Sequence, residues 1–322
     1  MRAAIFRQSG DSGVLSVEEV ATPKPGPGEV RVRVACSGVN PTDWKIRSGL
    51  TGGPPEDFQV PHHDGAGVVD AVGDGVGDRH VGQRVWTFLA ASGNRWGTAA
   101  DFTVLPAERT RPLPDAASDE LGACLGVPAV TAAHCLGGQP ERLAGATVLV
   151  AGGAGAVGHY AVELAKHAGA RVVATASTEE KRELARAAGA DLVVDYKSPS
   201  AAEEIRAFAP AVDRVVEVAL GANLDLDLAV CRSGAEIVTY ANEATDPTLP
   251  TRRLMGANAT LRFVLLYGVP PGELAAAVSW VEQALADGAL SPLPLHRFPL
   301  DQTAAAQDAV EQGAVGKVLV VP

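Results

Sequence analysis

The most informative stretch of the chain covers residues 147–162 and reads TVLVAGGAGAVGHYAV. Residues 147–151 form a predicted buried strand, and a predicted helix follows the spacing Gly153-x-Gly155-x-x-Gly158. In such a loop one glycine makes the tight turn and a second lets backbone N–H groups approach a pyrophosphate. The third glycine lets the helix pack close to the strand. This context predicts a dinucleotide-binding site; the alternative is a glycine-rich turn that serves packing only.

The sequence that follows this loop alternates between strands and helices. Predicted strands lie at residues 171–176, 192–194, 214–218 and 236–240. The predicted helices between them lie at residues 179–188, 201–209 and 224–231. Gly169 and Gly189 stand where helices end, because glycine favours the left-handed conformation that follows a last helical residue. Apolar strands that alternate with helices predict a parallel sheet covered on both faces, here a doubly wound α/β Rossmann domain over residues 122–262.

The first 121 residues differ, with many Gly and Pro residues between short valine-rich runs. These runs predict strands at residues 29–35, 67–72, 84–88 and 99–105. The last part of the chain contributes only two strands and one helix, at residues 261–266, 317–321 and 273–287. These elements are too few for a domain of their own. We therefore expect residues 263–322 to complete the domain of residues 1–121, which makes that domain discontinuous.

Composition excludes several classes of protein. The formal net charge of the 322 residues is −11, and such an acidic surface repels phosphate backbones, so we expect no nucleic-acid partner. Two charge-free stretches, residues 121–140 and 143–162, are long enough to span a bilayer, but polar residues and glycines interrupt them. We interpret both as buried core and expect no membrane span. No positively charged leader opens the chain and no CxxC pair occurs, so we expect a cytoplasmic protein with reduced thiols.

The end of the second predicted strand indicates which dinucleotide binds. An Asp or Glu there would bind the free 2′-hydroxyl of NADH, but residues 174–178 read ATAST. Ser177 and Lys181 follow instead, four residues apart, and Tyr196 ends the third strand. These three side chains could surround a 2′-phosphate, so we expect NADPH, although Glu179 and Glu180 would repel a phosphate. Ser177 has an alternative or additional role, because Ser177-x-x-Glu180 is a capping box.

Several motifs resemble those of a known family. They read GVNPTDWKIRSG at residues 38–49, PHHDGAGVV at 61–69, VGQRV at 81–85, VPAVTAA at 127–133 and GKVL at 316–319. With the glycine loop, they resemble in order the zeta-crystallin-type quinone oxidoreductases, in the zinc-free branch of the medium-chain dehydrogenases/reductases. The resemblance implies a GroES-like, mainly β catalytic domain beside the Rossmann domain. It also implies hydride transfer from NADPH to a quinone or another conjugated carbonyl.

Two alternatives to this function stay open. The first is an enone or enoyl-thioester reductase, which uses the same hydride chemistry on a different acceptor. The second is a nucleotide-binding protein with a structural or RNA-binding role, against which the net charge argues.

The resemblance also bears on metal. In the alcohol-dehydrogenase branch, the zinc ligands fall at positions that match Asn40, His63 and about Val127 of this chain. Catalytic zinc takes three protein ligands, and only His63 is a metal-binding residue type. We therefore expect no metal, and we interpret His63 as a structural histidine.

Without a metal, hydrogen-bond donors must meet the charge that develops on the substrate oxygen. Asn40 offers an amide N–H and Lys45 an ammonium group, so both are candidate catalytic residues. Similar enzymes usually have a tyrosine at the position of Lys45, and Lys45 could instead extend to solvent. Asp43, the third candidate, could orient Lys45 or cap the local helix. Trp44, Trp86 and Trp96 are candidate pocket walls, although aromatic core packing is the more common role for any one of them.

The resemblance implies further cofactor contacts, mostly at strand ends, where ligands bind in an open α/β sheet. These positions are Thr131 at the nicotinamide, Ala154, Gly155, Ala156 and Val157 at the pyrophosphate, Asn223, Tyr240, Ala241 and Asn242 after two strands, and Val264, Leu265 and Leu266 at the carboxamide. Asn223 could equally cap the helix that follows it. The strand at residues 261–266 would be an apolar sheet edge, and such edges tend to be paired, so we expect a homodimer.

Overall fold

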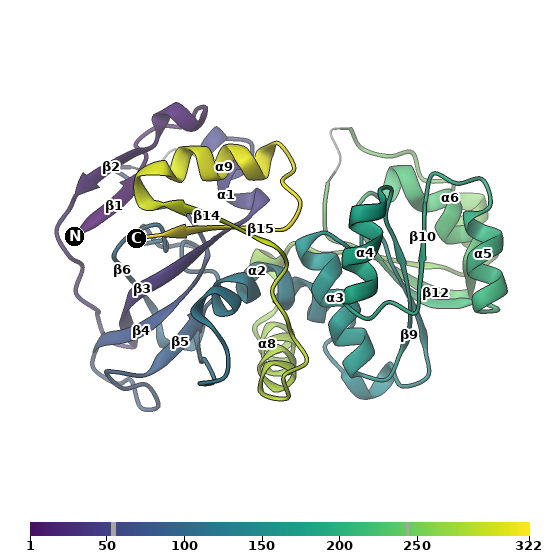
Figure 1. Ribbon diagram of the computed structural model, residues 1–322, viewed down its shortest axis with the longest axis horizontal. Helices are drawn as coiled ribbons and strands as arrows, with labels where there is room; N and C mark the ends of the chain where they lie inside the picture. The colour runs from purple at the N-terminus through teal and green to yellow at the C-terminus, as the bar shows by residue number, and fades with distance from the viewer. Residues whose placement is uncertain (53–55, 243–244) are drawn as a thin grey trace. The chain divides into compact units, whose positions relative to one another are not determined.

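The computed structural model describes residues 1–52, 56–242 and 245–322 and divides into two compact units. Unit 1 consists of Met1–Val127 and Pro294–Pro322, and unit 2 consists of Pro128–Leu293. In Figure 1 the purple N-terminal and yellow C-terminal segments both belong to unit 1, which is therefore discontinuous.

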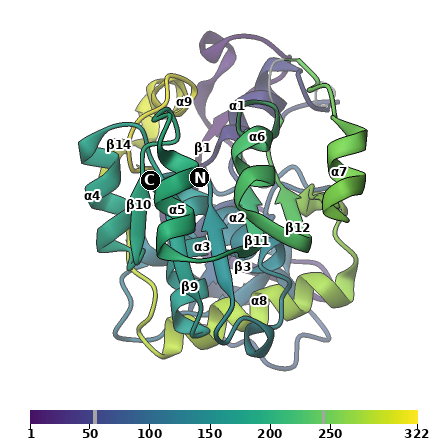
Figure 2. The ribbon, with the colours of Figure 1, turned by 90° about the vertical axis from the view of Figure 1, so that its right-hand side faces the viewer.

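Unit 2 is built on a six-stranded parallel sheet with the order β10-β9-β8-β11-β12-β13. The strands are β8 (Thr147–Val150), β9 (Arg171–Thr175), β10 (Leu192–Val194), β11 (Val212–Glu217), β12 (Cys231–Thr239) and β13 (Thr260–Phe263). The connecting helices are α3 (Ala156–His167), α4 (Glu179–Ala187), α5 (Ala201–Phe208), α6 (Leu220–Val230), α7 (Thr251–Ala257) and α8 (Pro271–Ala286). Figure 2 views this unit with α5 and α6 toward the reader. The order reverses beside β8, which is the doubly wound arrangement predicted from the sequence.

Apolar packing explains why β8 stands inside the sheet. All four of its residues are buried, as expected for a strand covered on both faces. Leu149 of β8 packs in one cluster with residues of β9, β11 and β12 and of α5 and α6, namely Val173, Val215, Ile237, Ile205 and Leu224. The helix α6 begins at Leu220, four residues before the predicted start at Leu224.

The expected domain boundaries are wrong for residues 263–293, which lie in unit 2. The reason is backbone pairing, because β13 continues the parallel sheet beside β12, with Leu261 opposite Ile237. The following helix α8 buries Trp280 and Val281 in the same unit. The strand is also shorter than predicted, since Leu266 belongs to a 3-10 helix. The N-terminal boundary falls after Val127, inside α2 (Asp119–Cys135), and not at residue 121.

Unit 1 is mainly β. Its large sheet has the order β14-β15-β3-β4-β5-β7, with β6 also paired to β3. These strands are β3 (Glu29–Val39), β4 (Asp64–Val72), β5 (Arg84–Thr87), β6 (Phe102–Pro106), β7 (Thr110–Pro112), β14 (Leu295–Pro299) and β15 (Lys317–Val321). A small sheet pairs β1 (Arg2–Ile5) with β2 (Ser16–Glu19), and the helices of this unit are α1 (Pro41–Ser48), α9 (Thr303–Glu311) and the first part of α2.

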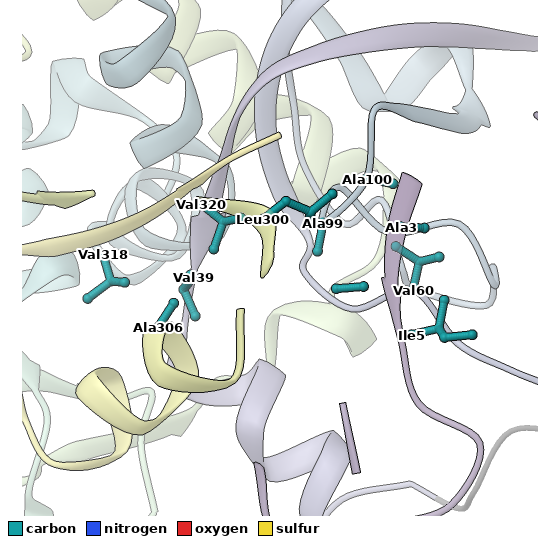
Figure 3. Packing of buried hydrophobic residues seen from close by; sticks show 11 residues of the cluster. Ala3, Ile5, Val39, Val60, Ala99, Ala100, Leu300, Ala306, Val318 and Val320 are labelled. Carbon is teal, nitrogen blue, oxygen red and sulfur yellow. The ribbon is translucent and has the colours of Figure 1, made fainter. Parts of the chain in front are cut away.

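The two distant parts of unit 1 share one core. β15 lies antiparallel to β3, with Val318 opposite Val39. Figure 3 shows these two residues in a buried cluster with Ala306 of α9 and with Ile5 of β1. Pairing and burial together fix β15 beside β3. Within the described ranges, no helix has both the length and the apolar character that a membrane crossing requires.

Candidate active site

The glycine loop of unit 2 joins β8 to α3, as the sequence predicts. A Cβ atom at Gly158 would lie 2.2 Å from the carbonyl oxygen of Gly152, so this glycine lets α3 approach the loop backbone. A Cβ atom at Gly153 would lie 2.7 Å from the Cβ of Ala174 in β9. A Cβ atom at Gly155 would lie 3.3 Å from the carbonyl oxygen of Gly152. Protein packing therefore requires glycine at 153 and 158, whereas a Cβ atom at Gly155 would make a milder contact with the loop backbone.

The start of α3 has the polarity that a pyrophosphate needs. Gly155 is the N-cap residue and has no side chain with which to cap the helix. The backbone N–H groups of the first turn, which begins with Ala156 and Val157, are therefore open to an anion, and the helix dipole favours one there. Ala154 is buried beside this turn. The loop, with its glycines and the N–H groups at the start of α3, fits the pyrophosphate of a dinucleotide.

The residues predicted to surround the 2′-phosphate lie together at the carboxyl ends of β9 and β10. Thr175 pairs with Val194, and both Ser177 and Tyr196 follow two residues later. Tyr196 is 38% exposed, and the Nζ atom of the adjacent Lys197 lies 5.8 Å from the centroid of its ring. Lys181 lies in the first turn of α4, which begins after the same end of β9.

The capping role expected for Ser177 is wrong. The N-cap residue of α4 is Thr178, whose Oγ1 accepts a hydrogen bond from the backbone N–H of Lys181 at 3.3 Å. The helix therefore starts one residue later than a cap at Ser177 would require, and the Ser177 hydroxyl is not used as a cap. Two arginines of α4 balance the charge of Glu179: Arg182 and Arg186 each approach its carboxylate to 2.7 Å. These ion pairs lower the pKa of Glu179 and offset its repulsion of a phosphate.

The remaining positions predicted to contact the cofactor in unit 2 lie mostly at this same end of the sheet. Glu217, Thr239 and Phe263, which end β11, β12 and β13, are in register. Directly after these strands come Tyr240, Ala241 and Asn242, and Val264, Leu265 and Leu266. Burial raises the pKa of the Tyr240 phenol well above its ordinary value. Thr131 is buried within α2.

Asn223 has a partner that the sequence does not reveal. It lies inside α6, not at its start, and its Nδ2 donates to Glu217 Oε1 at 2.9 Å. Glu217 also accepts the backbone N–H of Ala219. Asp227 of α6 lies close by, and both carboxyl groups are buried. Burial and the neighbouring Glu217 charge raise the pKa of Asp227 well above its ordinary value. Asn223 thus binds Glu217, one of two neighbouring buried carboxyl groups.

In unit 1, Asn40 is the N-cap residue of α1 and is almost fully buried. Its side-chain Nδ2 donates to Asp64 Oδ2 at 2.6 Å, and its Oδ1 accepts from Lys317 Nζ at 2.6 Å. The other Asp64 oxygen, Oδ1, accepts the backbone N–H of Val127 at 2.7 Å. The amide of Asn40 is therefore held from two sides by charged groups.

Asp43 plays the helix-capping role among its two alternatives. Its Oδ2 accepts the backbone N–H of Asn40 at 2.7 Å, and the backbone of His63 also donates to it. Asp43 is buried, and burial raises its pKa well above the ordinary value. Lys45 is half-buried, and its Nζ lies 5.8 Å from the centroid of the Trp44 ring.

The aromatic residues named as candidate walls pack in unit 1. Trp86 is fully buried, and its ring lies 5.8 Å from that of Phe88. Trp96 makes an edge-on contact with Phe58 at 5.4 Å. These contacts give Trp86 and Trp96 a core-packing role.

Comparison with known proteins adds the family. Residues 26–115 match the family described as alcohol dehydrogenase GroES-like domain, and residues 156–283 match the one described as zinc-binding dehydrogenase. A quinone oxidoreductase from Lama guanicoe is 30% identical over 328 residues, which cover 100% of this chain and 97% of that protein. The chain belongs to the quinone oxidoreductase family. The quinone oxidoreductase of Rattus norvegicus is 29% identical over 326 residues, which cover 100% of this chain and 98% of that protein.

A solved structure supports the same relationship. A mycobacterial protein complexed with NADPH is 29% identical to this chain, with a TM-score of 0.85 and full coverage of both chains. This member of the quinone oxidoreductase family thus shares the fold of a protein that binds NADPH.

The donor set of this quinone oxidoreductase family member does not fit zinc at the three positions that hold it in the alcohol-dehydrogenase branch. Asn40 is bound to Asp64 and Lys317, and Val127 contributes only a backbone N–H. His63 is buried, and burial lowers the pKa of its ring to about 3. Within the described residues, no cluster of three or more His, Cys, Asp or Glu side chains could hold a metal.

Sequence reasoning missed the partners of Asn40 in this quinone oxidoreductase family member. Asp64 and Lys317 both lie in motifs that carry the family resemblance, but no chemistry was assigned to them. A signal existed for Lys317, because it is a single charge at the start of the buried apolar strand KVLVV. Asp64 likewise precedes the apolar run GAGVV.

Proposed function

We propose that the chain is an NADPH-dependent reductase that delivers a hydride to a quinone or another conjugated carbonyl compound. The observation that carries this proposal is the end of β9, which has no carboxylate for a free 2′-hydroxyl and lies beside the glycine loop. When bound, NADPH supplies the hydride, and the nicotinamide end of the molecule would extend along the strand ends toward residues 240–242 and 264–266.

The residues at the adenosine end favour a phosphate on the ribose. Ser177 keeps its hydroxyl because Thr178 caps the helix. Lys181, Tyr196 and the neighbouring Lys197 add two positive charges and a phenol at the same edge. Lysine and hydroxyl groups are suited to phosphate, whereas an acid at this position would select the free hydroxyl.

Asn40, the N-cap residue of α1, and Lys45, within α1, are the candidates for the substrate oxygen. Hydride addition to a carbonyl conjugate places negative charge on that oxygen, and preorganised donors stabilise it. Asn40 Nδ2 carries a second hydrogen besides the one it gives to Asp64, and Lys45 carries an ammonium group. We propose that Asn40 donates to the oxygen and that Lys45 adds positive charge beside it.

The test is a steady-state assay with NADPH and NADH against a panel of quinones, enones and enoyl thioesters. We expect NADPH oxidation with quinones, and Asn40→Ala should lower kcat by about 10²–10³ with little change in NADPH affinity. Turnover confined to enones or enoyl thioesters would select the first alternative. NADPH binding with no turnover of any acceptor would refute the reductase and favour a nucleotide-binding role.

We also propose a homodimer and a cytoplasmic location. β13 is the edge strand of the sheet of unit 2. Its last residue Phe263 is 66% exposed, and Leu265, two residues later, is 69% exposed. An exposed apolar edge strand is suited to pairing with a second copy. Phe263→Asp should then convert a dimer to a monomer in sedimentation, whereas a monomeric parent protein at micromolar concentration would refute the dimer. The four cysteines are free, which suits a reducing compartment.

A further inference from the structure

Four groups that are far apart in the sequence meet in one buried polar network of unit 1. Asn40 precedes α1, Asp64 begins β4, Lys317 begins β15, and Val127 lies in α2. The side chains of Asn40, Asp64 and Lys317 are 2%, 0% and 3% exposed. Lys317 Nζ also lies 3.7 Å from Asp64 Oδ2. A buried lysine and a buried carboxylate therefore enclose a single neutral amide.

The chemistry of these neighbours allows only one orientation of the amide. An ammonium group donates and cannot accept, so Lys317 must face the Asn40 oxygen. An ionised carboxylate accepts and cannot donate, so Asp64 must face the Asn40 nitrogen. In the flipped amide, the Asn40 nitrogen would face the Lys317 ammonium group, so two donors would meet. The Asn40 oxygen would face the Asp64 carboxylate, so two acceptors would meet. The flipped amide would lose two charge-assisted hydrogen bonds among side chains that are almost fully buried.

We propose that Lys317 and Asp64 are positioning residues, which lock the side-chain amide of Asn40 so that its second N–H is presented to the substrate oxygen. The network uses one Nδ2 hydrogen, and within the described part of the chain the second has no acceptor. This inference rests on the proposed reductase for the substrate oxygen, but the locked orientation stands on the contacts alone. An unlocked amide would present its oxygen to the substrate for part of the time and repel the developing charge.

The lock depends on the ionised form of Asp64, because a protonated carboxyl becomes a donor and can face the amide oxygen. Burial raises the pKa of Asp64 to about 6, and the Lys317 charge works in the opposite direction. The other titratable groups that face this site are Asp43 of α1, Cys124 of α2 and His62 before β4. Burial keeps Cys124 and His62 neutral, since it moves their pKa values to about 12 and about 3. Asp43 bonds to the Asn40 backbone and does not touch the amide.

The first test reads the amide directly, in the whole protein labelled with ¹⁵N-asparagine. The chain has five asparagines, so the spectrum holds few side-chain amide signals, and loss of one pair in Asn40→Ser assigns Asn40. In the parent protein the Asn40 amide protons should titrate with a midpoint near pH 6. In Lys317→Met the midpoint should move to higher pH, because the charge that favours ionised Asp64 is gone. Lys166→Met removes a half-exposed lysine that pairs with Asp191, and it should leave these signals unchanged.

The second test is kinetic. Lys317→Met should lower kcat roughly 10- to 100-fold and leave the NADPH dissociation constant within twofold. Its kcat should fall at a higher pH than in the parent protein, and Lys317→Arg, which keeps a cationic donor, should restore both values in part. In Asp64→Asn the decline of kcat near pH 6 should disappear. A role in stability alone would lower the melting temperature without moving these pH profiles.

The outcomes separate the two proposals. Unchanged Asn40 amide signals in a folded Lys317→Met protein would overturn the lock, whatever the activity. If Lys317→Met does not fold, Asp64→Asn replaces it, and in that protein both the titration of the Asn40 amide signals and the decline of kcat near pH 6 should disappear. A parent protein that reduces no acceptor, but whose Asn40 signals shift as expected, would refute the reductase and leave the lock intact.

Discussion

Lys181 gives the sharpest test of cofactor choice. It stands in the first turn of α4, beside the carboxylate-free end of β9, and Lys181→Ala removes its charge without touching the cap, which uses only the Lys181 backbone. A hydrogen bond to a charged group contributes roughly 1.5–3 kcal/mol, and about 1.4 kcal/mol corresponds to a tenfold change in affinity. Because Lys181 is half-buried and solvent weakens the interaction, we expect the lower end of this range, roughly a tenfold weaker binding of NADPH.

The assay is a fluorescence titration of both cofactors at fixed ionic strength. NADH, which lacks the 2′-phosphate, should bind Lys181→Ala and the parent protein within about twofold of each other. Raising the salt concentration should weaken NADPH binding more than NADH binding in the parent protein, and this difference should shrink in the variant. Lys24→Ala, at an exposed lysine of unit 1, serves as the control and should change neither constant. Equal losses for NADPH and NADH in Lys181→Ala would show that Lys181 supports the fold and does not contact the phosphate.

Further expectations concern the glycine loop, the buried acids and metal. Gly158→Ala should destabilise unit 2 by about 3 kcal/mol in denaturant unfolding, since its Cβ would meet the Gly152 carbonyl. Gly155→Ala should retain stability but weaken the binding of NADPH. The raised pKa of Asp227 means that stability is lost as pH rises above the ordinary carboxyl range, so thermal unfolding of Asp227→Asn should depend less on pH. Dialysis against a strong chelator should leave turnover unchanged; loss of turnover that zinc restores would contradict the donor-set argument.

Local signals in the sequence were sufficient to predict the architecture of unit 2. The glycine loop, the apolar strands and the glycines after helices are all patterns within a few residues of each other, and they gave the doubly wound sheet. The closeness of Ser177 and Tyr196 could also be predicted, because parallel neighbouring strands have their carboxyl ends on the same side of the sheet. The cap at Thr178 was missed because Ser177 and Thr178 are both suited to capping, and only the helix start decides between them.

Contacts between distant segments could not be predicted. Asn40 and Lys317 are 277 residues apart, and no periodicity links them. The placement of residues 263–293 failed similarly, because an apolar strand carries no mark of the sheet it will join, and β13 joins β12 by backbone pairing. The role of Asn223 could not be predicted either. Its partner is Glu217, and nothing in the sequence indicates that this acid is buried.

The pairing of β15 with β3 has a consequence for synthesis. β3 leaves the ribosome early, but its partner β15 follows only after all of unit 2 has been translated. Unit 2 is a continuous segment and can fold while the chain is still growing, whereas the sheet of unit 1 must wait with an open edge at β3. Until β15 arrives, Asn40 also lacks Lys317. We expect the nascent chain to bind NADPH before Asn40, the residue proposed to contact the substrate oxygen, is held in place.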